Sequence, residues 1–454
     1  MQALTQQPIN QPYKGLEPFD ESDAPIFFGR EKDRDRIVNY LRSSRLTVLY
    51  GTSGVGKSSV LRAGVTYYLR QAAQQNLKRY GVPKFAVVVL KDWREDPLGE
   101  LIEQIKDESE KLLDGQKLPI MSPTRNLKEV LQVCTKFLGE EGEDGTLLIV
   151  LDQFEEYFLY HPQPEEGERT FEIEFPKAVN CLGLGVNFLI SIREDWIAQL
   201  DRFKVAIPNI LDNRLELKPL DEQSACDAIL NPVYKVYNRQ HKEGRISIEP
   251  ELVERILAEI ALETWHQDGH ERSDEETTTL FRPRTFQSSY LQVLMQHLWK
   301  EEMKNESHQL RLKTLEKLGG AKEVLKNYFK EEMEWLSKIA NPKWVNVVAK
   351  FVNYLVTPSG TKIAYPSEDL AVRAEIEERE LRLVLEELVK QHLLNPVISK
   401  DNPNLLCYEL SHDILAPVIL EWHNDYWKNR NRTKLEAIQN LSQVDIQAWQ
   451  EFLD

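Results

Sequence analysis

Residues 46–50 (LTVLY) form a short apolar run that leads directly into a glycine-rich loop. The loop is Gly51-Thr52-Ser53-Gly54-Val55-Gly56-Lys57-Ser58, and it fits the pattern GxxxxGK[ST]. After it, apolar residues recur at the spacing of one helix face: Leu61, Val65, Tyr68 and Ala72. A strand, a glycine loop and a helix in this order predict an α/β domain that binds nucleotide phosphates.

Each part of the loop has a chemical reason. Glycines let the backbone wrap a diphosphate without Cβ clashes, and the N-terminus of the following helix adds amide donors. Lys57 supplies a cation for the β- and γ-phosphates, and Ser58 offers a hydroxyl to Mg²⁺. The alternative is a structural glycine turn, which the flanking strand and helix disfavour. We predict that the phosphates of ATP or GTP contact Gly51, Thr52, Ser53, Gly54, Val55, Gly56, Lys57, Ser58 and Ser59.

A second apolar run, residues 146–151 (TLLIVL), ends in Asp152. A carboxylate at the end of a buried strand beside the glycine loop suits Mg²⁺, although a strand ending in Asp is often only a turn. Many hydrolysing relatives place a second acid next, to orient the attacking water, whereas this chain has Gln153. Glu155 and Glu156 are the nearest substitutes, and the sequence does not decide which of them faces the nucleotide. We therefore expect slow hydrolysis at most.

Arg193 directly follows a third apolar run, residues 186–192 (VNFLISI). A cation at the end of a neighbouring strand would reach the γ-phosphate. The alternative is a salt bridge with Glu194 or Asp195, and the residues alone favour neither interpretation.

The apolar runs at 85–90, 146–151 and 186–192 are unbroken, as in parallel strands buried on both faces. Helical patterns at 97–113 and 126–138 separate them, which predicts a mostly parallel sheet with flanking helices. Near the C-terminus, helical patterns at 344–355 and 376–392 precede a hairpin pattern in which LLNPVIS and LLCYEL flank KDNPN. Helices followed by a hairpin predict a winged helix.

The fold class predicted is an α/β P-loop NTPase domain followed by a helical domain and a winged-helix domain. The expected boundaries are a flexible tail at 1–12, the P-loop domain at 13–220, the helical domain at 221–335, the winged helix at 336–426, and a linker or tail helix at 427–454.

The 454-residue chain carries a formal net charge of −16, so as a whole it repels nucleic acid and anionic membranes. No apolar run approaches the roughly 20 residues that a membrane helix needs. Four dispersed cysteines form no CxxC pair and are typical of reduced thiols: Cys134, Cys181, Cys226 and Cys407. We expect a cytoplasmic protein with neither a membrane nor a nucleic-acid partner.

Several segments in the same order together resemble the novel-STAND branch of STAND NTPases over about residues 12–425. They are residues 12–31 (PYKGLEPFDESDAPIFFGRE), the glycine loop, LDQFEE, SIRED and YELSHDILAPVILEW. The resemblance implies a signalling switch that is closed with ADP and assembles into a ring or filament with ATP. In bacteria this branch is associated with anti-phage defence and programmed cell death.

The resemblance also implies roles for single residues. Gly29 and Arg30 belong to a segment similar to the adenine-side motif of the family, and Arg193 matches its γ-phosphate sensor. Ser411-His412-Asp413 is similar to the Met-His-Asp motif, whose histidine touches the β-phosphate of ADP. The alternative role of His412 is to cap the final helix. The family's Gly-Leu-Pro contact is not present as such, and Pro283 or residues 290–292 are the substitutes considered.

The sequence and the resemblance lead to three hypotheses for the function. The first is an ATP/ADP-dependent oligomerisation switch with Mg²⁺ as cofactor and a slow ATPase activity. It would act with a sensor or effector that is not recognisable within these residues. The second is a DNA-remodelling or DNA-loading ATPase, because winged helices often enter DNA grooves. The third is a scaffold that holds nucleotide permanently as a structural cofactor.

Overall fold

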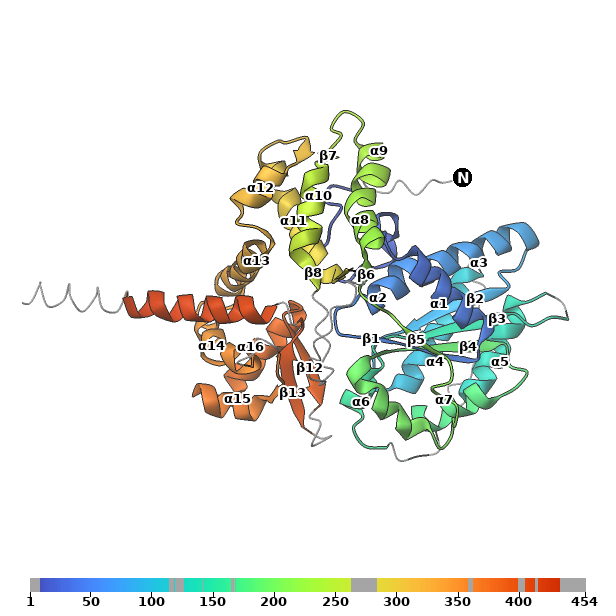
Figure 1. Cartoon of the computed structure of the whole chain (residues 1–454). Coiled ribbons are helices and arrows are strands. Elements are labelled where there is room, and N and C mark those ends of the chain that lie inside the picture. Colours follow the sequence, from blue (N-terminus) through green and yellow to red (C-terminus); the bar gives the residue numbers. More distant parts are fainter. Residues whose placement is uncertain are drawn as a thin grey trace, which may run out of the picture. The chain divides into compact units, whose positions relative to one another are not determined.

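A computed structural model describes residues 9–113, 118, 126–140, 142–164, 167, 169–262, 284–357, 362–398, 405–412 and 415–432. The chain divides into two compact units, Met1–Lys317 and Leu318–Asp454. Each unit is described by itself (Figure 1). The helical domain predicted at 221–335 is thus divided between the two units.

A five-stranded parallel sheet forms the centre of the first unit. Its strands are β1 (Leu46–Gly51), β2 (Phe85–Leu90), β3 (Thr146–Leu151), β4 (Val186–Arg193) and β5 (Arg214–Glu216). Their order is β2-β3-β4-β1-β5, and every neighbouring pair is parallel. The parallel sheet predicted from the unbroken apolar runs is confirmed. Because the strands run in one direction, the carboxyl ends of β1, β3 and β4 meet at one edge of the sheet, where ligands of open α/β sheets bind.

Helices lie on both faces of this sheet, with α1 and α3 above it and α5 and α7 below it in Figure 1. The helical elements are α1 (Glu31–Ser43), α2 (Lys57–Ser59), the π-helical η2 (Val60–Thr66), α3 (Tyr67–Tyr80), α4 (Pro97–Leu112), α5 (Leu127–Leu138), α6 (Glu155–Tyr160), α7 (Phe171–Asn180) and η3 (Glu194–Phe203). Buried residues of α1, η2 and α3, such as Leu41, Leu61 and Leu69, pack on strand residues in one hydrophobic core. The helices predicted at 97–113 and 126–138 are confirmed by α4 and α5.

An aromatic cluster fixes the chain where β3 ends. Its members are Trp93, Phe154, Tyr157, Phe158, Phe171, Phe175 and Phe203. Trp93 and Phe154 pack edge to face with ring centroids 5.0 Å apart, and the indole Nε1 of Trp93 donates to the carbonyl of Asp152 at 2.8 Å. The buried rings therefore hold the backbone around Asp152.

Helices continue the first unit after the sheet. They are α8 (Glu222–Asn231), the π-helical η4 (Pro232–Tyr237), α9 (Asn238–Gln240), α10 (Pro250–Ile260), α11 (Ser288–Lys304) and α12 (Leu312–Lys317). Short strands accompany them: β6 (Leu220–Asp221), β7 (Ser247–Ile248), β8 (Ala261–Leu262), β9 (Thr285–Phe286) and β10 (Gln309–Leu310). The N-terminal segment, with the 3₁₀ helix η1 (Glu21–Ile26), packs on the helices α8 and η4. Trp299 Nε1 donates to the carbonyl of Asn10 at 3.2 Å, so the packed part of the chain begins before residue 13.

The second unit contains α13 (Ala321–Trp335), η5 (Leu336–Ala340), α14 (Trp344–Phe351), η6 (Val352–Leu355), α15 (Ser367–Ala374), α16 (Glu378–Lys390), β11 (Tyr365–Pro366), β12 (Leu394–Ile398) and β13 (Leu406–Leu410). A further helical segment spans 415–432. The predicted hairpin is confirmed, since β12 and β13 pair antiparallel. Both α15 and β11 lie between the helical patterns at 344–355 and 376–392, where the sequence predicted no helix or strand.

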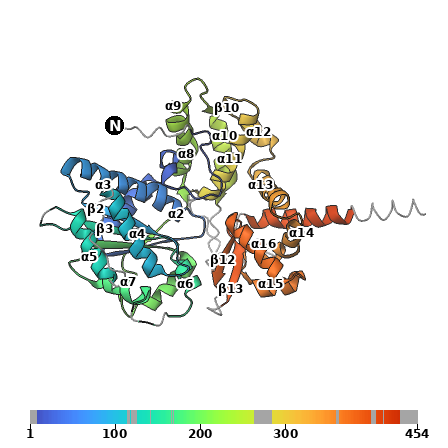
Figure 2. The same ribbon diagram turned by 180° about the vertical axis from the view of Figure 1, so that it is seen from behind.

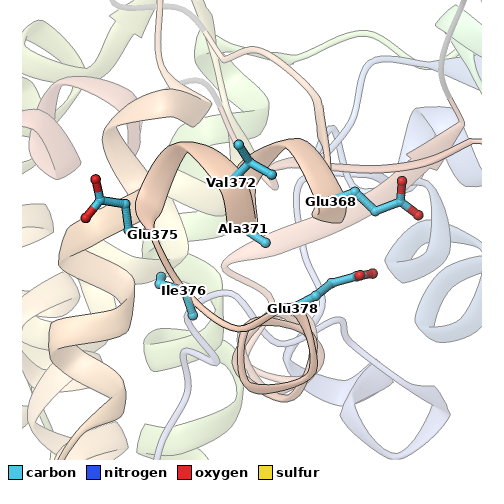
Figure 3. A pocket seen from close by; sticks show the side chains of 6 residues that line it. All are labelled: Glu368, Ala371, Val372, Glu375, Ile376 and Glu378. Carbon is cyan, nitrogen blue, oxygen red and sulfur yellow. The ribbon is translucent and has the colours of Figure 1, made fainter.

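A surface pocket of the second unit lies between α15 and the start of α16 (Figure 3). The two helices themselves are drawn from opposite sides in Figures 1 and 2. The lining residues of the pocket are Glu368, Ala371, Val372, Glu375, Ile376 and Glu378. This face is therefore acidic. Among the described residues of the whole chain, no helix combines the length and apolarity that crossing a bilayer requires.

Candidate nucleotide-binding site

The glycine loop connects β1 to α2 at the carboxyl edge of the sheet. Gly54 has φ of +74° and Gly56 has φ of +99°, the left-handed conformation that residues with a Cβ rarely adopt. A Cβ at Gly51 would lie 2.7 Å from the carbonyl oxygen of Leu217. The three glycines thus satisfy the turn and the close approach of neighbouring backbone.

Two side chains hold the carbonyl of Val55 in the middle of the loop. Arg30 is buried, and its Nη2 donates to the Val55 oxygen at 2.7 Å. Its Nη1 donates to the carbonyl of Lys218 at 2.8 Å. Ser288, at the start of α11, donates through Oγ to the same Val55 oxygen at 3.2 Å. Arg30, expected on the adenine side, therefore also braces the loop itself.

Ser288 was not predicted to replace the missing Gly-Leu-Pro contact. Of the predicted substitutes, Pro283 lies outside the described residues, and the side-chain oxygen of Gln292 accepts a hydrogen bond from Lys14 N at 3.2 Å. No local pattern marks Ser288, because it meets Val55 across 233 positions of sequence. The residue that contacts the loop is Ser288 at the start of α11, two positions before the segment 290–292.

Gly29 allows the N-terminal segment to pack against α8. Its φ is +86°, and a Cβ there would lie 2.3 Å from the carbonyl oxygen of Ser224. Ser59, at the end of α2, accepts a hydrogen bond on Oγ from Phe19 N at 3.2 Å. The N-terminal segment is thus bonded directly to the residues that follow the glycine loop.

Lys57 is only 9% exposed and bends over its own loop. Its Nζ donates to the carbonyls of Gly51 at 2.8 Å and Thr52 at 3.1 Å. Burial lowers the pKa of Lys57, and the nearby carboxylate of Glu155 opposes this shift. The ammonium group is therefore already held at the place where phosphates are expected.

Ser58 and Asp152 meet, as the two motifs predicted. Ser58 Oγ donates to Asp152 Oδ1 at 3.2 Å, and Asp152 is fully buried. A hydroxyl and a carboxylate are hard oxygen donors of the kind that Mg²⁺ prefers, so this pair fits the metal.

Arg62 also lies against this pair, and the sequence analysis missed it. Its Nη2 is 2.9 Å from Asp152 Oδ2 and 3.4 Å from Gln153 Oε1. The spacing from Ser58 to Arg62 is four residues, which places both on one helix face and was the available signal. Gln153 has φ of +54°, an uncommon value for a residue with a side chain, and such values cluster at functional sites.

Glu155 and Glu156 differ in their surroundings. Glu155 Oε2 accepts a hydrogen bond from the backbone N of Arg193 at 3.2 Å. Burial raises the pKa of Glu155, and Lys57 is the largest influence that lowers it. Burial also raises the pKa of Glu156, to about 8, with Glu155 and Asp152 adding to the shift. Glu155 is therefore the acid that lies between the loop lysine and β4.

Arg193 makes one of the two salt bridges that the sequence left open. Its Nη2 and Nε lie 2.8 and 3.1 Å from the two carboxylate oxygens of Asp195. Arg193 also pairs in register with Gly51 at the carboxyl ends of β4 and β1. A γ-phosphate contact of Arg193 remains a prediction.

His412 belongs to the second unit. Burial lowers its pKa to about 4, and Lys362 and His392 add to this shift. The imidazole is therefore neutral at neutral pH. The carbonyl of His412 accepts from Leu415 N at 3.1 Å, at the beginning of the helical segment 415–432. Asp413 lies outside the described residues, and the contact of His412 with ADP remains a prediction.

Comparison with solved structures found matches that cover most of the chain. The Aeropyrum pernix ORC1 protein in complex with DNA is 13% identical, with 88% of this chain and 94% of that chain covered and a TM-score of 0.43. A Walker-type ATPase of Pyrococcus abyssi is 17% identical, with coverage of 89% and 98% and a TM-score of 0.40. The Aeropyrum pernix ORC2 protein is 13% identical, with coverage of 89% and 95% and a TM-score of 0.42.

No curated protein matches the sequence. The family profile described as Novel STAND NTPase 1 matches residues 12–452, nearly the whole chain. The match spans the glycine loop, Asp152 and Arg193, and it agrees with the resemblance noted from the sequence. The chain is a member of the Novel STAND NTPase 1 family, the novel branch of the STAND P-loop NTPases.

Proposed function

We propose that this protein is an ATP/ADP-dependent switch, closed with ADP and self-associating with ATP, that acts in bacterial defence or programmed cell death. The observation that carries the proposal is the convergence of Lys57, Ser58 and Asp152 at the carboxyl edge of the sheet. Family membership supports the switch role, and the defence role comes from the family resemblance alone.

Different residues of the glycine loop would contact different parts of the nucleotide. Backbone amides of residues 51–59 wrap the phosphates, and Lys57 would leave its two carbonyl partners to meet the β- and γ-oxygens. Ser58 and Asp152 would hold Mg²⁺, which neutralises charge on the phosphates when it is bound. Arg30 and Ser288 keep the loop in its wrapped conformation through Val55.

Arg193 is the proposed sensor of the γ-phosphate. An incoming phosphate would compete with Asp195 for the guanidinium, so its presence would be reported by the loss of this ion pair. Moving such a switch from mostly closed to mostly open requires about 5.5 kcal/mol of differential binding. The proposed contact of His412 with the β-phosphate of ADP would contribute to the closed state.

Slow hydrolysis is consistent with a switch that stays in its ATP-bound state long enough to act. Gln153 has no carboxylate to orient water, and Glu155, one of the two substitutes predicted, accepts a hydrogen bond from Arg193 N. A second function, DNA loading, would need a basic face on the second unit. The pocket beside α15 is instead lined by three glutamates, which disfavours contact of that face with phosphates.

Light scattering tests the switch. We expect a monomer with saturating ADP, a defined oligomer with a non-hydrolysable ATP analogue, and no oligomer for Lys57→Ala. Assembly by Lys57→Ala that is shown to be free of nucleotide would overturn the proposal. An unchanged mass together with steeply salt-dependent DNA binding would favour the DNA-loading function instead. Nucleotide that never exchanges would indicate the structural scaffold.

A further inference from the structure

Both oxygens of the Asp152 carboxylate are already bonded. Oδ1 accepts from Ser58 Oγ at 3.2 Å and from Gln153 N at 3.0 Å. Oδ2 is 2.9 Å from Nη2 of Arg62. Asp152 is fully buried and Arg62 is 22% exposed, so this ion pair is largely shielded from water. The cation that balances the proposed Mg²⁺-binding carboxylate is thus a residue of the chain itself.

The fold places Arg62 here through an irregular helix. Arg62 lies within the π-helical turn η2, and π turns inside helices are rare and frequent at functional sites. Its second contact, Gln153 Oε1, comes from the residue with left-handed φ. Arg62 Nε is buried and has no hydrogen-bond partner among the residues that the structure describes. The guanidinium is therefore not a fully satisfied structural group.

We propose that Arg62 is an internal counter-ion that alternates with Mg²⁺ at Asp152, so that nucleotide is held with or without the metal. The inference rests on the proposed nucleotide site. A bare carboxylate beside the phosphates would repel them, and this repulsion is large where water is excluded. Arg62 cancels it when the metal is absent, and it releases Oδ2 when the metal is present. ADP would thus remain bound when the metal dissociates.

The test is the affinity of the full-length chain for a fluorescent ADP analogue, measured in EDTA and in MgCl₂. We expect Arg62→Met to weaken binding in EDTA by about tenfold or more, with a much smaller loss in Mg²⁺. Arg62→Lys, which keeps a cation, should retain part of the metal-independent binding. Equal losses for Arg62→Met in the two buffers, or no loss in either, would overturn the proposal.

Arg70 provides the matched control. It lies on the continuation of the same helix, its two Nη atoms are each 2.7 Å from a glutamate (Glu21 and Glu108), and its Nε is likewise buried without a partner among the described residues. It has no contact with Asp152. Arg70→Met should therefore change the affinity by the same factor in EDTA and in Mg²⁺. A metal-dependent effect of Arg70→Met equal to that of Arg62→Met would overturn the assignment.

Thermal unfolding separates this inference from the nucleotide site itself. Without nucleotide, Arg62→Met leaves the buried Asp152 without its ion-pair partner, so the Tm of this variant should fall in EDTA and recover in part with MgCl₂. The double variant Arg62→Met with Asp152→Asn should have a Tm closer to that of the wild type than the single variant Arg62→Met has. Failure of the wild type to bind ADP would refute only the proposed function. A Tm of Arg62→Met that is identical in EDTA and in Mg²⁺ would refute the proposed role of Arg62 as a counter-ion.

Discussion

The guanidinium of Arg193 is held by the carboxylate of Asp195, two residues along the chain, through contacts of 2.8 and 3.1 Å. The side chain of Arg193 is only 9% exposed, whereas that of Asp195 is 44% exposed. Because the Asp195 carboxylate is exposed, water solvates it once a phosphate takes its place on the guanidinium, so a ligand displaces Asp195 at small cost. The ion pair therefore orients the Arg193 side chain but can be replaced by a contact with a ligand.

Removal of the Asp195 carboxylate should therefore favour binding of the nucleoside triphosphate. Asp195→Asn should raise the affinity for a non-hydrolysable ATP analogue by about two- to fivefold and leave that for ADP unchanged. Arg193→Ala should lower the affinity for the analogue only. Isothermal titration with both nucleotides measures this, and Asp201→Asn, which removes an exposed ion pair with Lys204, is the control. Equal shifts for both nucleotides would show that Arg193 does not report the γ-phosphate.

The pKa of Glu156 predicts a pH dependence of stability. Burial raises this pKa from its ordinary value of 4.5 to about 8. Between these two values the folded state binds more protons than the unfolded state, so stability is greatest below the lower value and falls as pH rises toward 8. Glu156→Gln, which cannot ionise, should lose less stability between pH 5 and pH 8 than the wild type.

Urea unfolding at a series of pH values measures this difference. At the alkaline end, Glu156→Gln should be more stable than the wild type by roughly 1 kcal/mol or more. Glu194→Gln, an exposed position on η3, should follow the wild-type curve. Parallel curves for Glu156→Gln and the wild type would show that the carboxyl group titrates normally.

The strands and the loop could be predicted because their signals are local. Strands buried on both faces of a parallel sheet consist of unbroken apolar runs, and the glycine loop must supply its special backbone from consecutive residues. The meeting of Ser58 with Asp152 followed from topology, since the glycine loop that leads to Ser58 and the residue Asp152 both follow the carboxyl ends of parallel strands.

The remaining features depend on contacts between distant residues. Ser288 reaches Val55 across 233 positions, and no local pattern marks such a contact. Which glutamate faces Lys57 depends on the direction in which α6 leaves β3, and that direction is set by the aromatic cluster around Phe154. The eight-residue helix α15 escaped prediction because its segment is short and polar, with only four buried residues.

Gly29 should be intolerant of any side chain. Its positive φ and the 2.3 Å approach of a Cβ to the Ser224 carbonyl both oppose substitution. Gly81 has a similar φ of +78°, but a Cβ there meets no described atom within 4 Å. Gly81→Ala should therefore cost only the backbone strain, about 1 kcal/mol.

Gly29→Ala should cost about 2 kcal/mol more than Gly81→Ala, because backbone atoms must move to relieve the clash. Urea unfolding of the two variants isolates the free-energy cost of the clash, since both positions share the left-handed conformation. Equal losses of stability would mean that the N-terminal segment shifts freely against α8. ADP affinity of the folded fraction would then show whether the adenine-side motif depends on that packing.

Ser288 and Ser289 offer an adjacent pair for testing how α11 supports the glycine loop. Ser288 Oγ donates to the Val55 carbonyl at 3.2 Å, whereas Ser289 Oγ is buried with no hydrogen-bond partner in the part of the chain that the structure describes. Losing a donor to a loop carbonyl costs about 1 kcal/mol. Ser288→Ala should therefore weaken ADP binding about fivefold, because the loop is less well held in its wrapped conformation.

Ser289→Ala should leave the affinity near that of the wild type, since no hydrogen bond is lost. Fluorescent-ADP titration of both variants decides between two roles of the helix. If Ser288→Ala alone weakens binding, the start of α11 supports the loop and thereby links the helical part of the first unit to nucleotide occupancy. If the two variants behave alike, the Ser288 contact is only packing, and Arg30 suffices to hold Val55.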